Sequence, residues 1–171
     1  MPDKTIPLEE ITIRTDLRPG DIGYITYLHG DLYKKEYDYG IGFEYYVAFG
    51  LNEFYQQYDS SNNRIWMAEH QGNRIGFMLL MNRGEAAQLR YFLIHPDYRG
   101  IGLGNKFMLL YLEFLKECKY TSSYLWTTHE LDTAAHLYKK YGFVLTEERE
   151  SDDFGKRVIQ NRYDLKIQDH K

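Results

Sequence analysis

The 171-residue sequence contains a single cysteine, Cys118. One thiol cannot form an internal disulfide, and it leaves no second sulfur ligand for a structural zinc cluster. We therefore interpret Cys118 as a packed helix residue, and we expect a protein without a metal site.

Long apolar runs and basic clusters are absent as well. The amino terminus, MPDKTIPLEE, lacks the basic-then-apolar pattern of a secretory signal, and no apolar run approaches the length of a membrane span. The 21 basic side chains face 25 acidic ones, a net charge of −4, and no basic block could follow a phosphate backbone. These absences predict a cytoplasmic protein that binds neither membranes nor nucleic acid. The mildly acidic balance suits amines and other cations.

The residues that are present suffice for one hydrophobic core. With 43% hydrophobic residues, a chain of this length is about one domain long, so we predict a single globular domain over residues 1–171. Residues 11–15 alternate in polarity as a strand does. Apolar residues then recur at helical spacing over residues 22–28, until the HG pair at 29–30 interrupts them, with Asp31 able to cap a continuation.

A second, aromatic helix is expected after the GIG break at residues 40–42, and it should run to about Tyr58. Three β-prone runs follow the loop DSSNN, and short turn signals separate them. The pattern predicts an antiparallel meander made of RIWMAEH, RIGFMLLMN and AQLRYFLI.

The second half of the chain alternates between helices and strands. Apolar residues repeat every three or four positions over residues 107–118, which predicts a helix that ends near Lys119. SYLWTT reads as a strand, and DTAAHLYKKYG reads as a short helix with Asp132 as its candidate cap and Gly142 as its stop. A hairpin around residues 152–155 should close the chain. The order predicts a mixed α/β sheet with one crossover helix.

The stretch RGIGLG, residues 99–104, opens the crossover helix. The first amides of a helix lack backbone acceptors and lie at the positive end of its dipole, so this turn presents an anion site. Glycines at 100, 102 and 104 would let a pyrophosphate lie against the backbone, and a tight strand-to-helix turn is the alternative interpretation. The spacing fits neither the dinucleotide fingerprint nor a P-loop.

Together with the preceding FLIHPDY, this stretch resembles the acyl-CoA-binding motif R/Q-x-x-G-x-G/A of the GNAT superfamily of N-acetyltransferases. The resemblance extends through LYKKYGF at residues 137–143 and covers nearly the whole chain. HGDLYKKEY, LWTT and AAHLYKKYGF are further similar to the GNAT branch often fused to winged-helix antibiotic-resistance-type regulators, although these 171 residues include no regulator. The implied fold is a mostly antiparallel α/β sheet with a splayed parallel strand pair, flanked by helices.

The resemblance implies acetyl-CoA as co-substrate and no metal. It implies that backbone groups of Phe92, Leu93 and Ile94 pair with the pantetheine arm as an added strand would. It also implies that six backbone amides hold the pyrophosphate, with Arg99 adding charge nearby; these belong to Gly100, Ile101, Gly102, Leu103, Gly104 and Asn105.

The implied reaction is direct attack of a neutral amine on the acetyl thioester. Tyr138 matches the tyrosine that in many members protonates the departing thiolate, although its apolar helix face alone indicates a core aromatic. Neither QLRY nor WTT contains the carboxylate that serves as base in many members. Glu36, Asp38, Glu44 and His129 are left as candidates, beside an amine of low pKa or a water relay.

Many of the 17 tyrosines lie between residues 24 and 58. These aromatic side chains could pack the helices, form a dimer contact or line an acceptor pocket: Tyr33, Tyr37, Tyr39, Phe43, Tyr45 and Tyr46. The predicted function is acetyl-CoA-dependent N-acetylation of a small amine or amino-acid-like acceptor. A non-catalytic acyl-CoA-binding or regulatory protein is the alternative, and a homodimer is left open.

Overall fold

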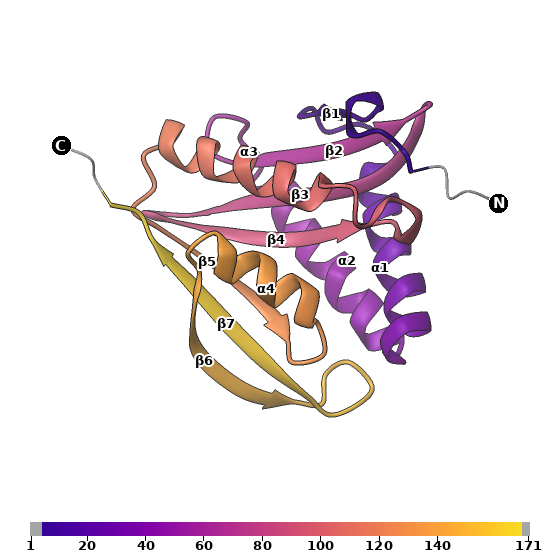
Figure 1. The fold of residues 1–171 in the computed structure, drawn as a ribbon. Coiled ribbons are helices and arrows are strands. Elements are labelled where there is room, and N and C mark those ends of the chain that lie inside the picture. The colour runs from indigo at the N-terminus through magenta and orange to yellow at the C-terminus, as the bar shows by residue number, and fades with distance from the viewer. Residues whose placement is uncertain (1–4, 169–171) are drawn as a thin grey trace.

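A seven-stranded sheet with helices on both faces organises the chain in the computed structural model, which describes residues 5–168 (Figure 1). The strands are β1 (Thr12–Arg14), β2 (Arg64–His70), β3 (Asn73–Arg83), β4 (Ala86–Ile94), β5 (Ser122–Thr128), β6 (Val144–Ser151) and β7 (Val158–Lys166). The helices are α1 (Asp21–Tyr37), α2 (Ile41–Gln56), α3 (Leu103–Glu117) and α4 (Asp132–Lys140), with short 3-10 helices at Leu8–Glu10 and Pro96–Tyr98. This order confirms the predicted succession of strands and helices.

The strands lie in the order β1-β2-β3-β4-β5-β7-β6, and every neighbouring pair is antiparallel except β4 and β5. The helix α3 makes the crossover between these two parallel strands. Their pairing covers only Ala86–Gln88 against Ser122–Tyr124, and beyond it the two strands diverge (Figure 1). The predicted mixed sheet with a splayed parallel pair is therefore confirmed.

Two hydrophobic cores lie on the two faces of the sheet. β3 is buried on both faces, which explains its continuous apolar run. Met78 and Leu80 pack in the core beneath α3 and α4, whereas Phe77 and Leu79 pack in the core beneath α1 and α2. Figure 1 shows α3 and α4 on the near side of the sheet and α1 and α2 on the far side.

Two expected helix boundaries were wrong. The helix α1 continues through Gly30 without interruption. This glycine lets Glu44 of α2 approach closely, because a Cβ at position 30 would lie 2.3 Å from Glu44 Oε1. In α4, Leu131 occupies the N-cap position and Asp132 is the first helical residue, with no side-chain cap. As a carboxylate in the first turn, Asp132 still interacts favourably with the positive end of the helix dipole.

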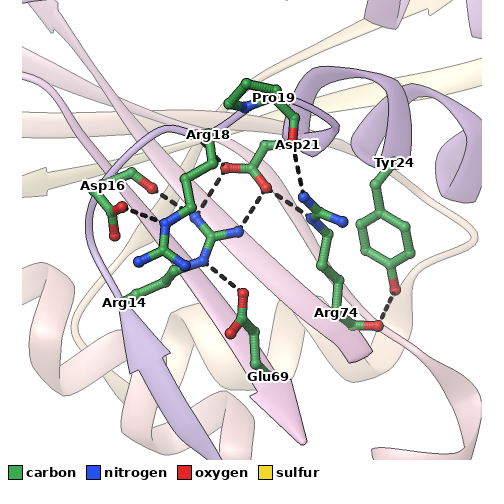
Figure 2. Close-up of polar contacts among 8 residues, drawn as sticks. All are labelled: Arg14, Asp16, Arg18, Pro19, Asp21, Tyr24, Glu69 and Arg74. Carbon is green, nitrogen blue, oxygen red and sulfur yellow. Dashed lines mark hydrogen bonds and ion pairs between the residues drawn. The ribbon is translucent and has the colours of Figure 1, made fainter. Parts of the chain in front are cut away.

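Asp21, the first residue of α1, is fully buried, and Figure 2 shows the cluster around it. Arg14 of β1 donates two hydrogen bonds to the carboxylate at 2.6 and 2.9 Å, Arg74 of β3 donates one at 2.7 Å, and the Arg18 amide donates one at 2.8 Å. Burial alone would raise the pKa of Asp21, but these bonds outweigh it and hold that pKa below its ordinary value. The cluster fastens α1 to two strands of the sheet.

The predicted hairpin of β6 and β7 is confirmed, and its tip reaches the junction of α1 and α2. The Phe154 carbonyl accepts a hydrogen bond from the Gly40 amide at 2.9 Å. Gly155 has a φ of +81°, and a Cβ there would lie 3.0 Å from Gly40 N, so this approach requires glycine. Within residues 5–168, no helix has the length and apolar character needed to cross a membrane.

Candidate active site

The divergence of β4 from β5 leaves one edge of β4 unpaired. The His95 amide donates a hydrogen bond to the Ile75 carbonyl at 2.8 Å, so His95 faces β3. Because successive residues of an antiparallel strand present their backbone groups to opposite sides, Leu93 also faces β3, while Phe92 and Ile94 face the gap. Phe92 therefore offers both of its backbone groups to the gap, whereas Ile94 offers only its amide, because its carbonyl accepts a hydrogen bond from Arg99.

A β-bulge interrupts β4 beside the gap. The register between β3 and β4 shifts at Phe77 and Leu79, so that Tyr91 and Phe92 both lie opposite Met78. Tyr91 adopts a φ of +60°, a left-handed conformation that is costly for a residue with a side chain. Bulges re-aim backbone and side chains at functional sites, and here the bulge directs the next amide into the gap.

The glycine-rich turn ends at the amino terminus of α3. Gly100 and Gly102 have φ values of +77° and +93°, so the turn itself requires glycine at both positions. The first helical backbone bond runs from the Lys106 amide to the Gly102 carbonyl at 3.1 Å, which leaves the amides of residues 103–105 without helical acceptors. No acidic residue occupies the first turn. The turn and anion-site interpretations are therefore compatible.

A groove of about 650 Å³ lies between β4, this turn and α4. Eight of the ten residues predicted to bind a cofactor line it: Phe92, Leu93, Ile94, Arg99, Gly100, Gly102, Gly104 and Asn105. Ile101 is half-buried and Leu103 is buried in the core, so any contact from these two to the groove would use their backbone amides. Gly104 also brings α3 against α4, because a Cβ there would lie 3.3 Å from Leu137.

The charges of the groove differ from the expected arrangement. Arg99 lies 2.8 Å from Glu36 and donates a hydrogen bond to the Ile94 carbonyl at 3.1 Å, so its charge is partly neutralised. Lys140 of α4 lines the groove and donates to Asn105 Oδ1 at 2.7 Å. Sequence reasoning missed Lys140, although it lies within the LYKKYGF motif. Among residues 5–168, no group of histidine, cysteine and carboxylate side chains could hold a metal ion.

A second cavity, of about 120 Å³, adjoins the groove; Tyr33, Phe92, Leu131 and Ala134 line both. Tyr138 of α4 lines this second cavity with only 5% of its surface exposed. Its hydroxyl makes no hydrogen bond to another residue in the described part of the chain, and burial raises the pKa of Tyr138 far above its ordinary value. Tyr138 is thus both a core aromatic and a lining residue at the junction.

The carboxylates considered as bases lie outside this cavity, whose described lining residues include no acid. Glu36 pairs with Arg99, Asp38 is exposed at the end of α1 and pairs with Lys34, and Glu44 packs against Gly30. None of these three carboxylates therefore lines the second cavity, although Glu36 lines the adjoining groove.

The two histidines near the cavity have settled hydrogen bonds. His129 is exposed, and its Nδ1 accepts a hydrogen bond from the Ile159 amide at 3.1 Å. His29, which the sequence treated only as part of a helix break, lines the cavity, and its Nδ1–H donates to the Ile25 carbonyl at 2.8 Å. Burial lowers the pKa of His29 to about 4, so the ring is neutral at neutral pH.

The aromatic segment packs the helices against the sheet and also lines the second cavity. Tyr33, Tyr39 and Phe43 are buried in the core beneath α1 and α2, whereas Tyr45 and Tyr46 are exposed. Three members of the segment also line the second cavity: Tyr33, Phe43 and Tyr46. Packing against the sheet therefore brings several rings to the cavity wall.

Comparisons with known proteins agree with this geometry. The sequence model of the Acetyltransferase (GNAT) family matches residues 30–143, well over half of the chain. The uncharacterized N-acetyltransferase YjgM of Escherichia coli (strain K12) is 31% identical over 97 residues, which span 54% of this chain and only 58% of that protein.

Two solved structures share the fold at low sequence identity. A GNAT family acetyltransferase from Elizabethkingia anophelis with acetyl-CoA bound has a TM-score of 0.66 at 16% identity, over 93% of this chain and 99% of that chain. The spermidine N-acetyltransferase from Vibrio cholerae, in complex with CoA and spermine, has a TM-score of 0.68 at 22% identity, over 92% and 96%. The similarity to the regulator-fused branch stays a prediction.

Proposed function

The chain belongs to the GNAT family of acetyltransferases, and from that premise we propose that it is an acetyl-CoA-dependent N-acetyltransferase. A single catalytic domain would acetylate the amine of a small acceptor. The observation that carries the proposal is the junction between two hollows: a groove of about 650 Å³ along the free edge of β4 meets a cavity of about 120 Å³ beside Tyr138. Two substrates could meet there.

The residues of the groove fit coenzyme A. The amide and carbonyl of Phe92 and the amide of Ile94 offer an edge to which the amides of a pantetheine arm could pair as an added strand. The unpaired amides at the start of α3 offer donors and a favourable dipole for a pyrophosphate, and Lys140 adds a positive charge. When bound, acetyl-CoA supplies the activated thioester.

The chain's own groups would assist the transfer as follows. The Phe92 amide beside the bulge donates a hydrogen bond to the carbonyl oxygen as negative charge develops on it. Tyr138 donates its phenolic proton to the sulfur as the carbon–sulfur bond breaks and the carbon–nitrogen bond forms. The acceptor amine must arrive neutral, and burial near a positive side chain without a carboxylate lowers an amine's pKa. One of the two amine protons then leaves through water, and a proton taken up from water restores the Tyr138 hydroxyl.

The alternative, a non-catalytic acyl-CoA-binding protein, is not favoured. Such a protein would need only the groove, whereas this chain also has a second cavity that adjoins the groove and is lined by Tyr138.

Two measurements test the proposal. Coenzyme A at about a hundredfold over its Kd should stabilise the fold by roughly 2.7 kcal/mol and raise the Tm by several degrees, whereas NAD should not. Thiol release from acetyl-CoA should then depend on an added amine. A Tm shift with NAD alone would contradict the cofactor assignment. Coenzyme A binding without thiol release for any amine would favour the non-catalytic alternative.

A further inference from the structure

The second cavity has an unusual charge for a site that accepts amines. Among its described lining residues, Arg90 is the one permanently charged side chain, and no carboxylate faces it. Arg90 lies on β4, and only 14% of its side chain is exposed. A protonated amine would find no counter-ion in this cavity, although the whole protein carries a net negative charge.

The positive charge of Arg90 is only partly balanced from behind. Its Nη1 lies 3.4 Å from Glu53 Oε2, but the other oxygen of Glu53 accepts a closer hydrogen bond from Arg83 at 2.5 Å. The Arg83 hydrogen bond is the main reason that the pKa of Glu53 falls below its ordinary value, so this carboxylate is ionised. Two arginines thus share one carboxylate, so this group carries an excess positive charge, and Arg90 is the member of it that lines the cavity.

Two buried glutamines that line the cavity present donors as well. Gln88 Oε1 accepts a hydrogen bond from Arg83 Nε at 3.0 Å, and Gln160 Oε1 accepts one from Arg149 Nε at 2.9 Å. Because arginine only donates, these contacts orient each amide with its NH₂ group free. Within residues 5–168, neither NH₂ group donates a hydrogen bond, and both glutamines line the cavity.

From this arrangement we infer that the acceptor is a small amino acid or a similar amine that carries a carboxylate, which binds Arg90 and the glutamine amides. Gln88 and Arg90 lie two residues apart on one strand, so their side chains share a face and can hold the two oxygens of one carboxylate. The acceptor amine then lies toward the junction near Tyr138. This inference rests on the proposed function and deepens it by naming the acceptor class.

The remaining lining of the cavity limits the rest of the acceptor. Trp126, Phe154 and Tyr46 supply aromatic surface, and the volume of about 120 Å³ lies well below the 300–1,000 Å³ of drug-sized sites. A short apolar side chain fits such a space. A polyamine does not, because its extra ammonium groups would face Arg90 without a carboxylate partner.

The test compares amines that differ only in the carboxylate. Thiol release from acetyl-CoA is measured with the 20 proteinogenic amino acids, with matched decarboxylated amines such as 3-methylbutylamine for leucine and 3-methylthiopropylamine for methionine, and with spermidine. In the wild type, we expect kcat/KM to favour the best amino acid over its matched amine by about 10- to 150-fold, the range for a hydrogen-bonded charge. Arg90→Gln should remove most of this preference, and Arg90→Lys should retain part of it.

Arg64→Gln is the matched control, because Arg64 lies 4.0 Å from the Phe114 ring on the opposite face of the sheet. This variant should keep the full preference, and coenzyme A should raise the Tm of every variant equally. If spermidine or the matched amines are acetylated as well as the amino acids, the inference is wrong while the proposed function stands. If no amine in any series releases thiol although coenzyme A binds, the proposed function itself fails. The wild-type comparison decides the matter even if the Arg90 variants do not fold.

Discussion

Two groups of ionised side chains lie at the two ends of β3, and they differ in charge balance. Near Arg74, three arginines meet three carboxylates: Arg14, Arg18 and Arg74 with Asp16, Asp21 and Glu69 (Figure 2). Near Arg83, two arginines share Glu53 alone. The balanced group joins α1 to the sheet, whereas the unbalanced group leaves a positive charge at a cavity wall. Charge balance thus separates a group that serves the fold from one suited to bind a ligand.

The largest expected effect is on the balanced group. Asp21→Ala leaves Arg14 and Arg74 without the buried carboxylate that they share. Removing one partner of a buried ion pair typically costs about 3–5 kcal/mol, so urea unfolding should show a loss of this size. For a chain of this length the Tm should fall by about 2–4 °C per kcal/mol, while the KM for acetyl-CoA in the folded fraction should not change.

Asp16→Ala is the control, because the side chain of Asp16 is 56% exposed and its surface pair with Arg18 should contribute little to stability. Acid provides a second check. Since the folded-state pKa of Asp21 is lowered, its stabilisation is complete above the unfolded pKa of about 3.9 and is lost as the pH falls below it. The Asp21→Ala variant should lose less stability than the wild type over that acid range. An equal loss in both proteins would contradict the role given to Asp21.

Tyr138→Phe should have the opposite effect from Asp21→Ala: it should lower the rate of the reaction and leave the stability of the fold almost unchanged. The variant keeps the buried ring but removes the proposed proton donor, so kcat should fall by about 10²-fold with little change in unfolding free energy or in the Kd for acetyl-CoA. Because burial raises the pKa of Tyr138, its ionisation should not appear in the rate profile below the ordinary tyrosine value of about 10. Full kcat in the variant would return Tyr138 to a purely structural role.

The smallest expected effect is that of Glu53→Gln, which makes the sharpest comparison with Asp21. The side chain of Glu53 is 42% exposed, so its loss should cost at most about 1 kcal/mol of stability. Because Glu53 competes for Arg90, we expect the KM for the best amino acid to fall rather than rise. A stability loss as large as that of Asp21→Ala would show that both groups serve the fold alike.

Local pattern was enough to predict much of the fold and part of the site. The three-strand meander, the crossover helix and the final hairpin follow from periodicity and turn residues, because each depends on neighbours in the sequence. The glycine-rich turn beside the groove was also predictable, because the positive φ values of Gly100 and Gly102 are a local requirement that favours glycine. The role of Gly30 was not predicted, because it depends on close contact with Glu44, which lies on another helix.

The ion pairs of the site could not be predicted from the sequence either, because they too join residues on separate elements. The sequence predicted Arg99 as a free charge, but in the structure Glu36 of α1 lies 2.8 Å from it. The sequence indicated no partner for Lys140, which donates a hydrogen bond to Asn105 of α3. In the sequence, Gln88 and Arg90 were notable only because the stretch QLRY lacks the carboxylate that many family members have there. Only the cavity around them suggests what they could bind.

By itself, the sequence determined the order of the strands and helices, the glycine turn and the membership of the family, because each is written in residues that lie near one another along the chain. The tertiary structure alone decided that Asp21 is buried between two arginines, that Tyr138 adjoins the groove, and that Arg90 faces a cavity without a carboxylate. The physical reason is that burial and electrostatic pairing depend on distances through space. Residues 21 and 74, or 90 and 160, come to one site only when the sheet has formed.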